Sequence, residues 1–256
     1  MYPVLFRIGN FAVSSYGVMV ALGFFLAYWT ATLEFRRLRL PLGPLQDMLI
    51  AAVVGGILGA KLMYIFENVP LAEFLSHPFR YLLERSGLTY YGGFLLGAIL
   101  VLAVVQVRRL PFGKVADALA PGLALAYAVG RIGCFLVGDD YGVPTTLPWG
   151  VAFPQGAPPT PPGVRVHPTQ IYETLTMGLV FYLLWRLRTR SHRPGWLFSL
   201  YLVLAGLERF LIEFIRMTTP SPIPGLTWAQ VIALGMVLVG GGLLYRFRRG
   251  ASPSVP

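Results

Sequence analysis

Two arginines lie inside long apolar stretches of this sequence. Arg131 is flanked by glycines in Gly130-Arg131-Ile132-Gly133, and Arg209 lies four residues before Glu213. A charged side chain at the centre of a bilayer costs about 2.5–3.5 kcal/mol even on insertion-based scales, so each arginine needs a ligand or a partner. The glycines leave room beside Arg131, and a planar guanidinium can contact a phosphate through two hydrogen bonds. The pattern predicts a site for an anionic lipid headgroup, although Arg209 and Glu213 also have the spacing of a structural ion pair.

Tyrosine, amide and carboxylate side chains occur near the ends of other apolar stretches. Tyr16 and Tyr91 each lie at the start of one stretch, and Gln170 and Glu173 lie in the first turns of another. These groups could form hydrogen bonds with the polar part of a lipid. The tyrosines also have the positions expected of aromatic-belt residues at a membrane interface. No Ser-His-Asp set, metal cluster or nucleotide-binding loop accompanies them, so the sequence predicts neither a metal nor a cofactor.

The composition indicates that membrane-spanning helices position these residues. Of the 256 residues, 55% are hydrophobic and only 12% are charged, and the mean hydropathy is +0.64. Soluble domains carry about 25% charged residues, so the composition excludes a soluble enzyme and a disordered chain. The net charge of +10 does not indicate a nucleic-acid partner, because the basic residues lie between apolar runs. The single cysteine, Cys134, excludes an intramolecular disulfide and is interpreted as a small buried residue.

Seven stretches approach the roughly 20 apolar residues that a helix needs to cross a bilayer. We therefore predict an all-α, polytopic membrane protein with seven transmembrane helices in a single domain, residues 1–256. The segment 138–168, rich in proline and glycine, is predicted to be an external loop that packs on the helices. The predicted spans are 11–31, 48–67, 89–107, 116–137, 169–185, 196–215 and 227–245.

Lysine and arginine are distributed unequally between the two sides of these spans. Thirteen follow the first, third, fifth and seventh spans, five lie on the opposite side, and three lie inside spans. Because cytoplasmic loops are rich in lysine and arginine, the N-terminus is predicted to lie outside and the C-terminus in the cytoplasm. This orientation places Arg131, Arg209, Glu173, Tyr16 and Tyr91 in the outer half of the membrane.

Several motifs appear in an order that covers the chain from the first span to the last but one. Residues 130–142 read GRIGCFLVGDDYG, residues 167–173 read HPTQIYE, and residues 208–216 read ERFLIEFIR. Shorter motifs are Tyr16-Gly17, residues 91–93 (YGG) and residues 147–150 (LPWG). Together these motifs resemble those of the prolipoprotein diacylglyceryl transferase family.

The resemblance implies a bacterial membrane enzyme whose partners are phosphatidylglycerol and the signal peptides of prolipoproteins. It would move the diacylglyceryl group of the lipid onto the lipobox cysteine thiol, forming a thioether and releasing glycerol-1-phosphate, as the first step of lipoprotein maturation. We expect a monomer with its active site at the outer face. The implied catalytic residues are Arg131, Arg209 and Tyr91. The implied substrate-binding residues are Arg131, Arg209, Tyr16, Gly92, Gly93, Asp139, Gly142, His167, Gln170, Glu173 and Glu213.

The sequence departs from the family's pattern at several positions. Many members have histidine, often assigned as the base, where this chain has Tyr91, and many have asparagine at Cys134 and glutamate at Asp139. Some have tyrosine at Ala205. Tyrosine, with a pKa near 10, is a poor general base at neutral pH, so we expect Tyr91 to orient the headgroup while the thiol loses its proton to water or to the leaving phosphate. The other candidate bases are Asp139, His167, Glu173 and Glu213.

Two other classes of protein compete with this interpretation. A lipid or anion transporter with an outer headgroup site would carry polar groups through to the cytoplasmic side and often has paired repeats. The cytoplasmic halves of the predicted spans are almost purely apolar, and the number of spans is odd. A structural membrane anchor would leave Arg131 without an explanation.

Overall fold

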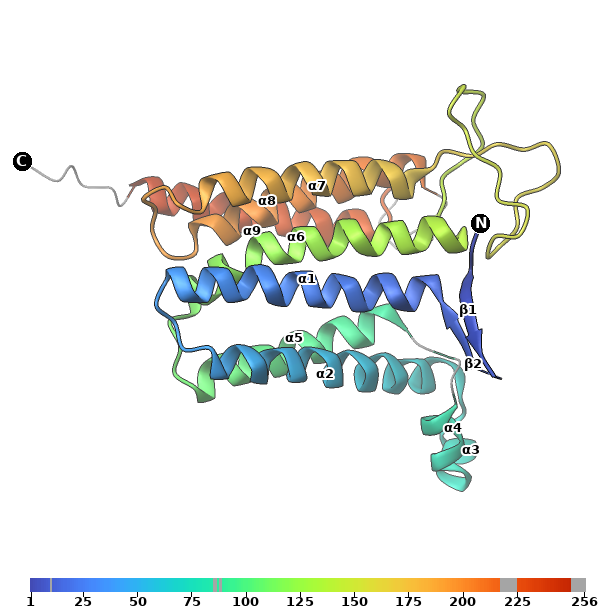
Figure 1. Ribbon diagram of the computed structural model, residues 1–256, viewed down its shortest axis with the longest axis horizontal. Coiled ribbons are helices and arrows are strands. Elements are labelled where there is room, and N and C mark those ends of the chain that lie inside the picture. Colours follow the sequence, from blue (N-terminus) through green and yellow to red (C-terminus); the bar gives the residue numbers. More distant parts are fainter. Residues whose placement is uncertain (10, 85–86, 88, 217–224, 250–256) are drawn as a thin grey trace, which may run out of the picture. The chain divides into compact units, whose positions relative to one another are not determined.

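The computed structural model describes residues 1–9, 11–84, 87, 89–216 and 225–249, most of which lie in helices (Figure 1). The long helices are α1 (Ser15–Arg37), α2 (Gly43–Asn68), α5 (Tyr90–Val107), α6 (Phe112–Val137), α7 (Thr169–Leu187), α8 (Trp196–Ile212) and α9 (Trp228–Arg249). The short elements are strands β1 (Val4–Ile8) and β2 (Phe11–Ser14), helices α3 (Leu71–Ser76) and α4 (Pro78–Leu83), and the 3₁₀-helix η1 (Glu213–Ile215).

Each predicted apolar stretch coincides with one long helix. The largest difference at a start is in the second stretch, which was predicted from residue 48 and whose helix α2 begins at Gly43. In the first stretch, residues 11–14 belong to β2, which pairs antiparallel with β1. This hairpin and the short helices α3 and α4 were not expected from the sequence, so the strictly all-α description needs that correction. Hydropathy averaged over about 20 residues does not detect elements of four to six residues.

Within the described residues, four helices are long and apolar enough to cross a membrane by their length and composition. They are α1, α2, α6 and residues 228–247 of α9. Helix α5 is apolar but shorter. The chain is therefore a mostly helical protein of the membrane-embedded class.

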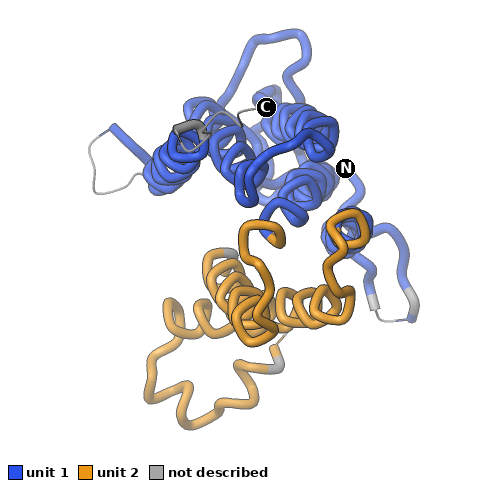
Figure 2. Tube along the Cα trace, turned by 90° about the vertical axis from the view of Figure 1, so that its left-hand side faces the viewer, with its two compact units in different colours: residues 1–34, 116–256 blue, residues 35–115 orange. Residues whose placement is uncertain are grey.

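Contacts divide the chain into two compact units (Figure 2). Unit 1 comprises residues 1–34 and 116–256, and unit 2 comprises residues 35–115. Unit 1 holds the β-hairpin, most of α1 and α6, and all of α7, α8 and α9. Unit 2 holds α2 to α5.

Small residues bring the helices of unit 1 close together. A Cβ atom at Gly122 of α6 would lie 2.7 Å from the Thr30 hydroxyl oxygen of α1, and one at Gly133 would lie 3.0 Å from Met19. Such close approach across glycine is typical of membrane helices. On the other side of α6, side chains of α6, α7 and α8 form one hydrophobic cluster, which consists of Ala120, Ala124, Ala128, Met177, Val180, Leu184, Leu197 and Ala205.

Unit 2 is built on the packing of α2 against α5, again through glycine. A Cβ atom at Gly55 would lie 2.8 Å from the Cα atom of Gly97, and one at Gly93 would lie 2.6 Å from the carbonyl oxygen of Gly56. The backbone of Gly92 approaches that of Gly59 equally closely. Larger side chains at these positions would separate the two helices.

The segment 138–168 has a small core of its own. The ring of Tyr141 stacks on Phe153 at 5.4 Å between centroids, and its hydroxyl donates a hydrogen bond to the Pro158 carbonyl at 2.8 Å. Val166 forms β-bridges with Pro144 and Val151. The segment is thus an ordered loop that joins the end of α6 to the start of α7.

Candidate functional site

Glu173 is the centre of a buried polar network in unit 1. It lies in the second turn of α7 and is completely buried. Its carboxylate forms an ion pair with Arg131 and a second with Arg216 at 3.3 Å, and the Arg209 guanidinium lies 3.8 Å away. The hydroxyl of Tyr127 donates a hydrogen bond to the same carboxylate at 2.8 Å. Three guanidinium groups therefore converge on one carboxylate.

Four elements of unit 1 bring these groups together. Tyr127 and Arg131 are four residues apart on α6 and so lie on one face of that helix. Arg209 comes from the last turn of α8, and Arg216 follows η1, which continues α8. The backbone of Arg216 is held by a β-bridge to Gly142, next to the hydrogen bond that the Val143 N–H donates to the Ile215 carbonyl at 2.9 Å.

Two further carboxylates complete the ion pairs of the arginines. Asp140 lies between Arg131 and Arg216 and contacts each guanidinium at 2.9 Å. Glu213 pairs with Arg209 at 2.8 Å and accepts a hydrogen bond from the Thr227 hydroxyl at 2.7 Å. The i,i+4 ion pair that the spacing of Arg209 and Glu213 suggested is thus present.

Several N–H groups of the arginines remain available in this network. The buried atoms Nε of Arg131, Nη1 of Arg209 and Nε of Arg216 have no hydrogen-bond partner within the described part of the chain. Buried polar groups are normally satisfied, and each exception calls for an explanation. An anion with several acceptor oxygens would satisfy donors of this kind. The arrangement therefore suits a phosphate group more than a purely structural network.

The chain between α6 and α7 is tied to the start of α7. The Gln170 side-chain amide donates to the Asp139 carbonyl at 2.5 Å, and the Thr169 hydroxyl donates to the Asp140 carbonyl at 2.9 Å. Burial raises the pKa of the Asp139 carboxyl above its usual value. Burial also acts to raise the pKa of Asp140, but Arg216 and Arg131 outweigh it and lower that pKa, so the ion pairs of Asp140 persist at moderately acidic pH.

Comparison with known proteins identifies the family of this chain. Residues 3–246 match the family described as prolipoprotein diacylglyceryl transferase. The chain belongs to this family. The phosphatidylglycerol–prolipoprotein diacylglyceryl transferase of Clostridium tetani is 35% identical over 241 residues, which cover 94% of this chain and 95% of the relative. The protein of the same name from Geobacter sulfurreducens is 36% identical over 249 residues, with 93% and 92% covered. The resemblance inferred from the motifs is confirmed.

The structure places most of the residues that family resemblance implied in unit 1. Arg131, Arg209, Glu173 and Glu213 belong to the network, and Gln170 holds the Asp139 backbone beside it. The other unit 1 residues of the implied set lie around the network: Tyr16 packs on Gly133, and Gly142 and His167 are in mutual contact.

The positions of Gly142 and His167 indicate a structural contribution. A Cβ atom at Gly142 would lie 2.8 Å from the Thr169 side chain and 2.9 Å from the Cβ atom of His167, so only glycine lets the chain approach Ile215 here. The His167 ring lies edge-on to Tyr172, with Nδ1 at 3.4 Å from its hydroxyl. Both residues support the backbone that carries Arg216.

Tyr91, Gly92 and Gly93 belong to unit 2. The tyrosine side chain is 47% exposed at the start of α5. The space beside both glycines is occupied by the backbone of α2. The two glycines thus permit α2 and α5 to pack directly beside Tyr91.

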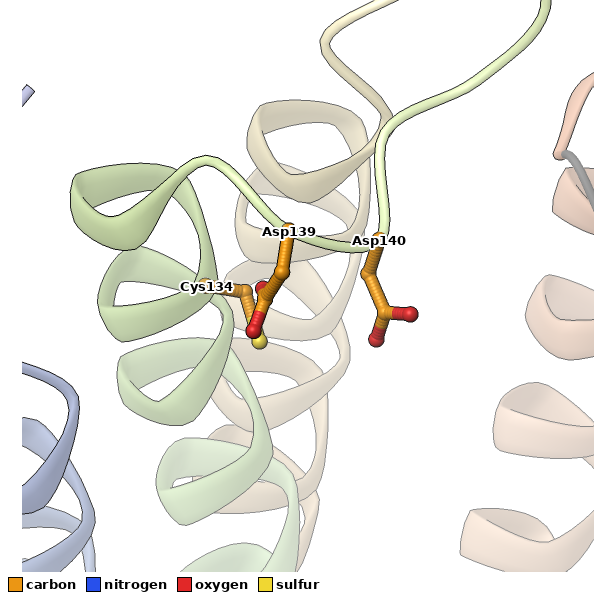
Figure 3. A group of neighbouring side chains, drawn as sticks. All are labelled: Cys134, Asp139 and Asp140. Carbon is orange, nitrogen blue, oxygen red and sulfur yellow. The ribbon is translucent and has the colours of Figure 1, made fainter. Parts of the chain in front are cut away.

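Cys134, Asp139 and Asp140 form the group that most resembles a metal site among the described residues (Figure 3). One potential ligand atom from each lies within 4.8 Å of the others. The Arg131 guanidinium contacts the same group, at 3.4 Å from the Cys134 sulfur and 2.9 Å from Asp140. A fixed positive charge at this distance repels a cation, so these residues are better suited to holding Arg131 than a metal ion.

Cys134→Ala and Cys134→Asn are expected to retain most of the transferase activity. The acceptor thiol belongs to the substrate, and the contact between the Cys134 sulfur and Arg131 is weak. The measurement is the rate of lipid transfer to a lipobox peptide. Covalent lipid trapped on Cys134 during turnover, with activity lost in both variants, would instead indicate a two-step reaction through a modified enzyme.

Sequence reasoning missed three members of the network. Arg216 ends the motif at residues 208–216 but has no predicted role, although it lies seven residues after Arg209 and three after Glu213, a spacing that keeps all three near one helix face. Tyr127 carried a weaker signal, its four-residue spacing from Arg131. Asp140 had no signal that distinguished it from Asp139.

Proposed function

We propose that this protein transfers the diacylglyceryl group of phosphatidylglycerol to the lipobox cysteine thiol of prolipoproteins, forming a thioether and releasing glycerol-1-phosphate. Membership of the family and the names of its relatives support the reaction and both substrates. The observation that carries the proposal is the convergence of three arginines whose buried N–H groups include several without a partner among the described residues. The leaving group of this reaction is a phosphate ester, and N–H donors of this kind stabilise its negative charge.

Arg131 and Arg209 bind the headgroup phosphate and stabilise the charge that develops on it as the carbon–oxygen bond breaks. Tyr91 orients the headgroup through its hydroxyl. The positive field of the arginines also favours the thiolate of the incoming peptide, whose unperturbed thiol has a pKa of about 8.5. The remaining substrate-binding residues in this proposal are Tyr16, Gly92, Gly93, Asp139, Gly142, His167, Gln170, Glu173 and Glu213.

The decisive assay uses the purified full-length protein, phosphatidylglycerol and a synthetic lipobox peptide. Mass spectrometry should show the mass of one diacylglyceryl group added to the peptide cysteine. A peptide with serine in place of that cysteine is the matched control and should gain no mass. Absence of transfer to the cysteine peptide would contradict the proposed function.

The proposed reaction requires a site that opens toward the outer leaflet of a bacterial cell membrane. We place seven crossings at α1, α2, α5, α6, α7, α8 and α9, with the N-terminus outside and segment 138–168 as an external loop of a single, monomeric transferase. The charge count of thirteen against five supports this orientation.

Labelling of single cysteines in intact cells tests this topology. In a Cys134→Ala background, Thr146→Cys in the external loop should react with an impermeant thiol reagent. Ser191→Cys, between α7 and α8, should react only after the cells are opened. Both positions are exposed, so they are matched in accessibility. The reverse labelling pattern would overturn the proposed orientation.

Tyr91→Phe is expected to cause a modest loss of activity with an unchanged pH profile between pH 6 and pH 9. The reason is that Phe keeps the ring but loses the hydroxyl that orients the headgroup. The measurement is the transfer rate across this range. A loss of several hundredfold that higher pH rescues would make Tyr91 the base.

A further inference from the structure

One buried carboxyl group beside the arginine network makes no ion pair with the described arginines. Glu208 lies in α8 directly before Arg209 and is 8% exposed. Ala205 and Ile212, one turn before and one turn after it, are buried as well, so this face of α8 points into unit 1. The Oε1 atom of Glu208 is buried and has no hydrogen-bond partner among the described residues. Burying such a group unpaired costs free energy, so its presence requires an explanation.

Glu208 lies beside the proposed phosphate site. Glu173, Arg209, Arg131 and Arg216 are all within electrostatic range of its carboxyl group, and so is Tyr127. Helix α9, which also packs against α8, has no acidic residue and carries its arginines only at its C-terminal end. The charged surroundings of Glu208 are therefore those of the arginine network.

The absence of an ion pair with a described arginine distinguishes Glu208 from the carboxylates of the network. Asp140, Glu173 and Glu213 each contact at least one guanidinium, so protonation of any of them would weaken an ion pair. Glu208 makes no ion pair with a described arginine. Unlike these three carboxylates, Glu208 can gain or lose a proton without breaking an ion pair with a described arginine.

We propose that Glu208 accepts the proton of the substrate thiol and passes it to the departing phosphate. This role rests on the proposed function, and it replaces water as the expected acceptor. The S–H proton moves to a Glu208 carboxylate oxygen, and the thiolate attacks the diacylglyceryl carbon that bears the phosphate. The S–C bond forms as the C–O bond breaks, the electron pair leaves with the phosphate oxygen, and the phosphate takes the proton from Glu208. The carboxylate is then regenerated.

The test compares Glu208→Gln with the wild-type protein on two peptides under reducing conditions. One peptide carries the lipobox cysteine, and the other carries selenocysteine, whose selenol is already ionised at neutral pH and needs no base. With the cysteine peptide, the variant should lose about 10²–10⁴-fold in rate, the usual contribution of general acid–base catalysis. With the selenocysteine peptide it should stay within about tenfold of wild type. Glu73→Gln, an exposed glutamate of α3, is the matched control and should behave as wild type with both.

The two possible failures are distinguishable. If the wild-type protein shows no transfer, the proposed function is contradicted. If the wild-type protein is active and Glu208→Gln loses the same factor in rate on both peptides, or loses no rate on either, the role of Glu208 is overturned. The ratio of the transfer rates with the cysteine and selenocysteine peptides is measured on one preparation of each variant. Partial misfolding lowers both rates equally and does not change this ratio. If Glu208→Gln is not recovered, Glu208→Asp should show an intermediate ratio, because its carboxyl is retracted by one methylene. If Glu208→Asp instead showed the same ratio of rates as the wild-type protein, the proposal would be overturned.

Discussion

Arg131→Lys is expected to lower the rate of diacylglyceryl transfer at least about 100-fold, the cost of removing one donor from a site that stabilises developing negative charge. The guanidinium of Arg131 contacts Asp140 and Glu173 through its Nη atoms, and its Nε has no hydrogen-bond partner among the described residues. A lysine ammonium retains the positive charge, but it lacks the planar guanidinium that contacts Asp140 and Glu173 at the same time. The measurement is transfer to the lipobox peptide by the purified protein.

Arg209→Ala should have an effect of the same order, because it removes the guanidinium whose buried Nη1 has no hydrogen-bond partner in the part of the chain that the structure describes. Arg186→Lys, at an exposed arginine in the last turn of α7, is the matched control and should leave the rate unchanged. Melting temperatures of all three variants separate loss of function from loss of folding. Normal activity in a folded Arg131 or Arg209 variant would exclude phosphate binding at that position.

Glu173→Ala is expected to destabilise the protein by about 3–5 kcal/mol, since it leaves buried guanidinium groups without their shared counter-ion. Glu173 is completely buried, and the side chains of Arg131 and Arg216 are each only 9% exposed, so solvent cannot replace the carboxylate. For a chain of this size the change corresponds to a fall in Tm of roughly 6–20 °C. Thermal unfolding in detergent measures it.

Two variants show whether that effect comes from the buried charge. Glu173→Gln keeps the side-chain volume and should still lower the Tm, because the missing charge and not a cavity is the cause. Asp47→Ala breaks an exposed ion pair with Arg108 and should change stability by less than about 1 kcal/mol. A wild-type Tm for Glu173→Ala would show that the arginines do not depend on Glu173.

Local composition was sufficient to predict the helices and two of the arginines. Each apolar stretch found in the sequence corresponds to one long helix, because an apolar run of about 20 residues can satisfy its backbone in a membrane only as a helix. Arg131 and Arg209 could be identified as candidate site residues, since a charge inside an apolar run is costly wherever the helix packs. The hairpin of β1 and β2 escaped prediction because its strands are too short for that signal.

The convergence on Glu173 was decided by tertiary structure alone. Tyr127 and Arg216 both reach this carboxylate across more than 40 residues of sequence, one from α6 and the other from the segment after η1. Hydropathy and helical periodicity identify which face of a helix is apolar, but they do not specify which other helix packs against that face. The same limit applies to Glu208, because a carboxyl in a helix is paired or unpaired only according to the donors that neighbouring helices bring to it. The sequence by itself therefore determined the helices and the need for buried charge partners, and the packing of α6, α7 and α8 determined the partners.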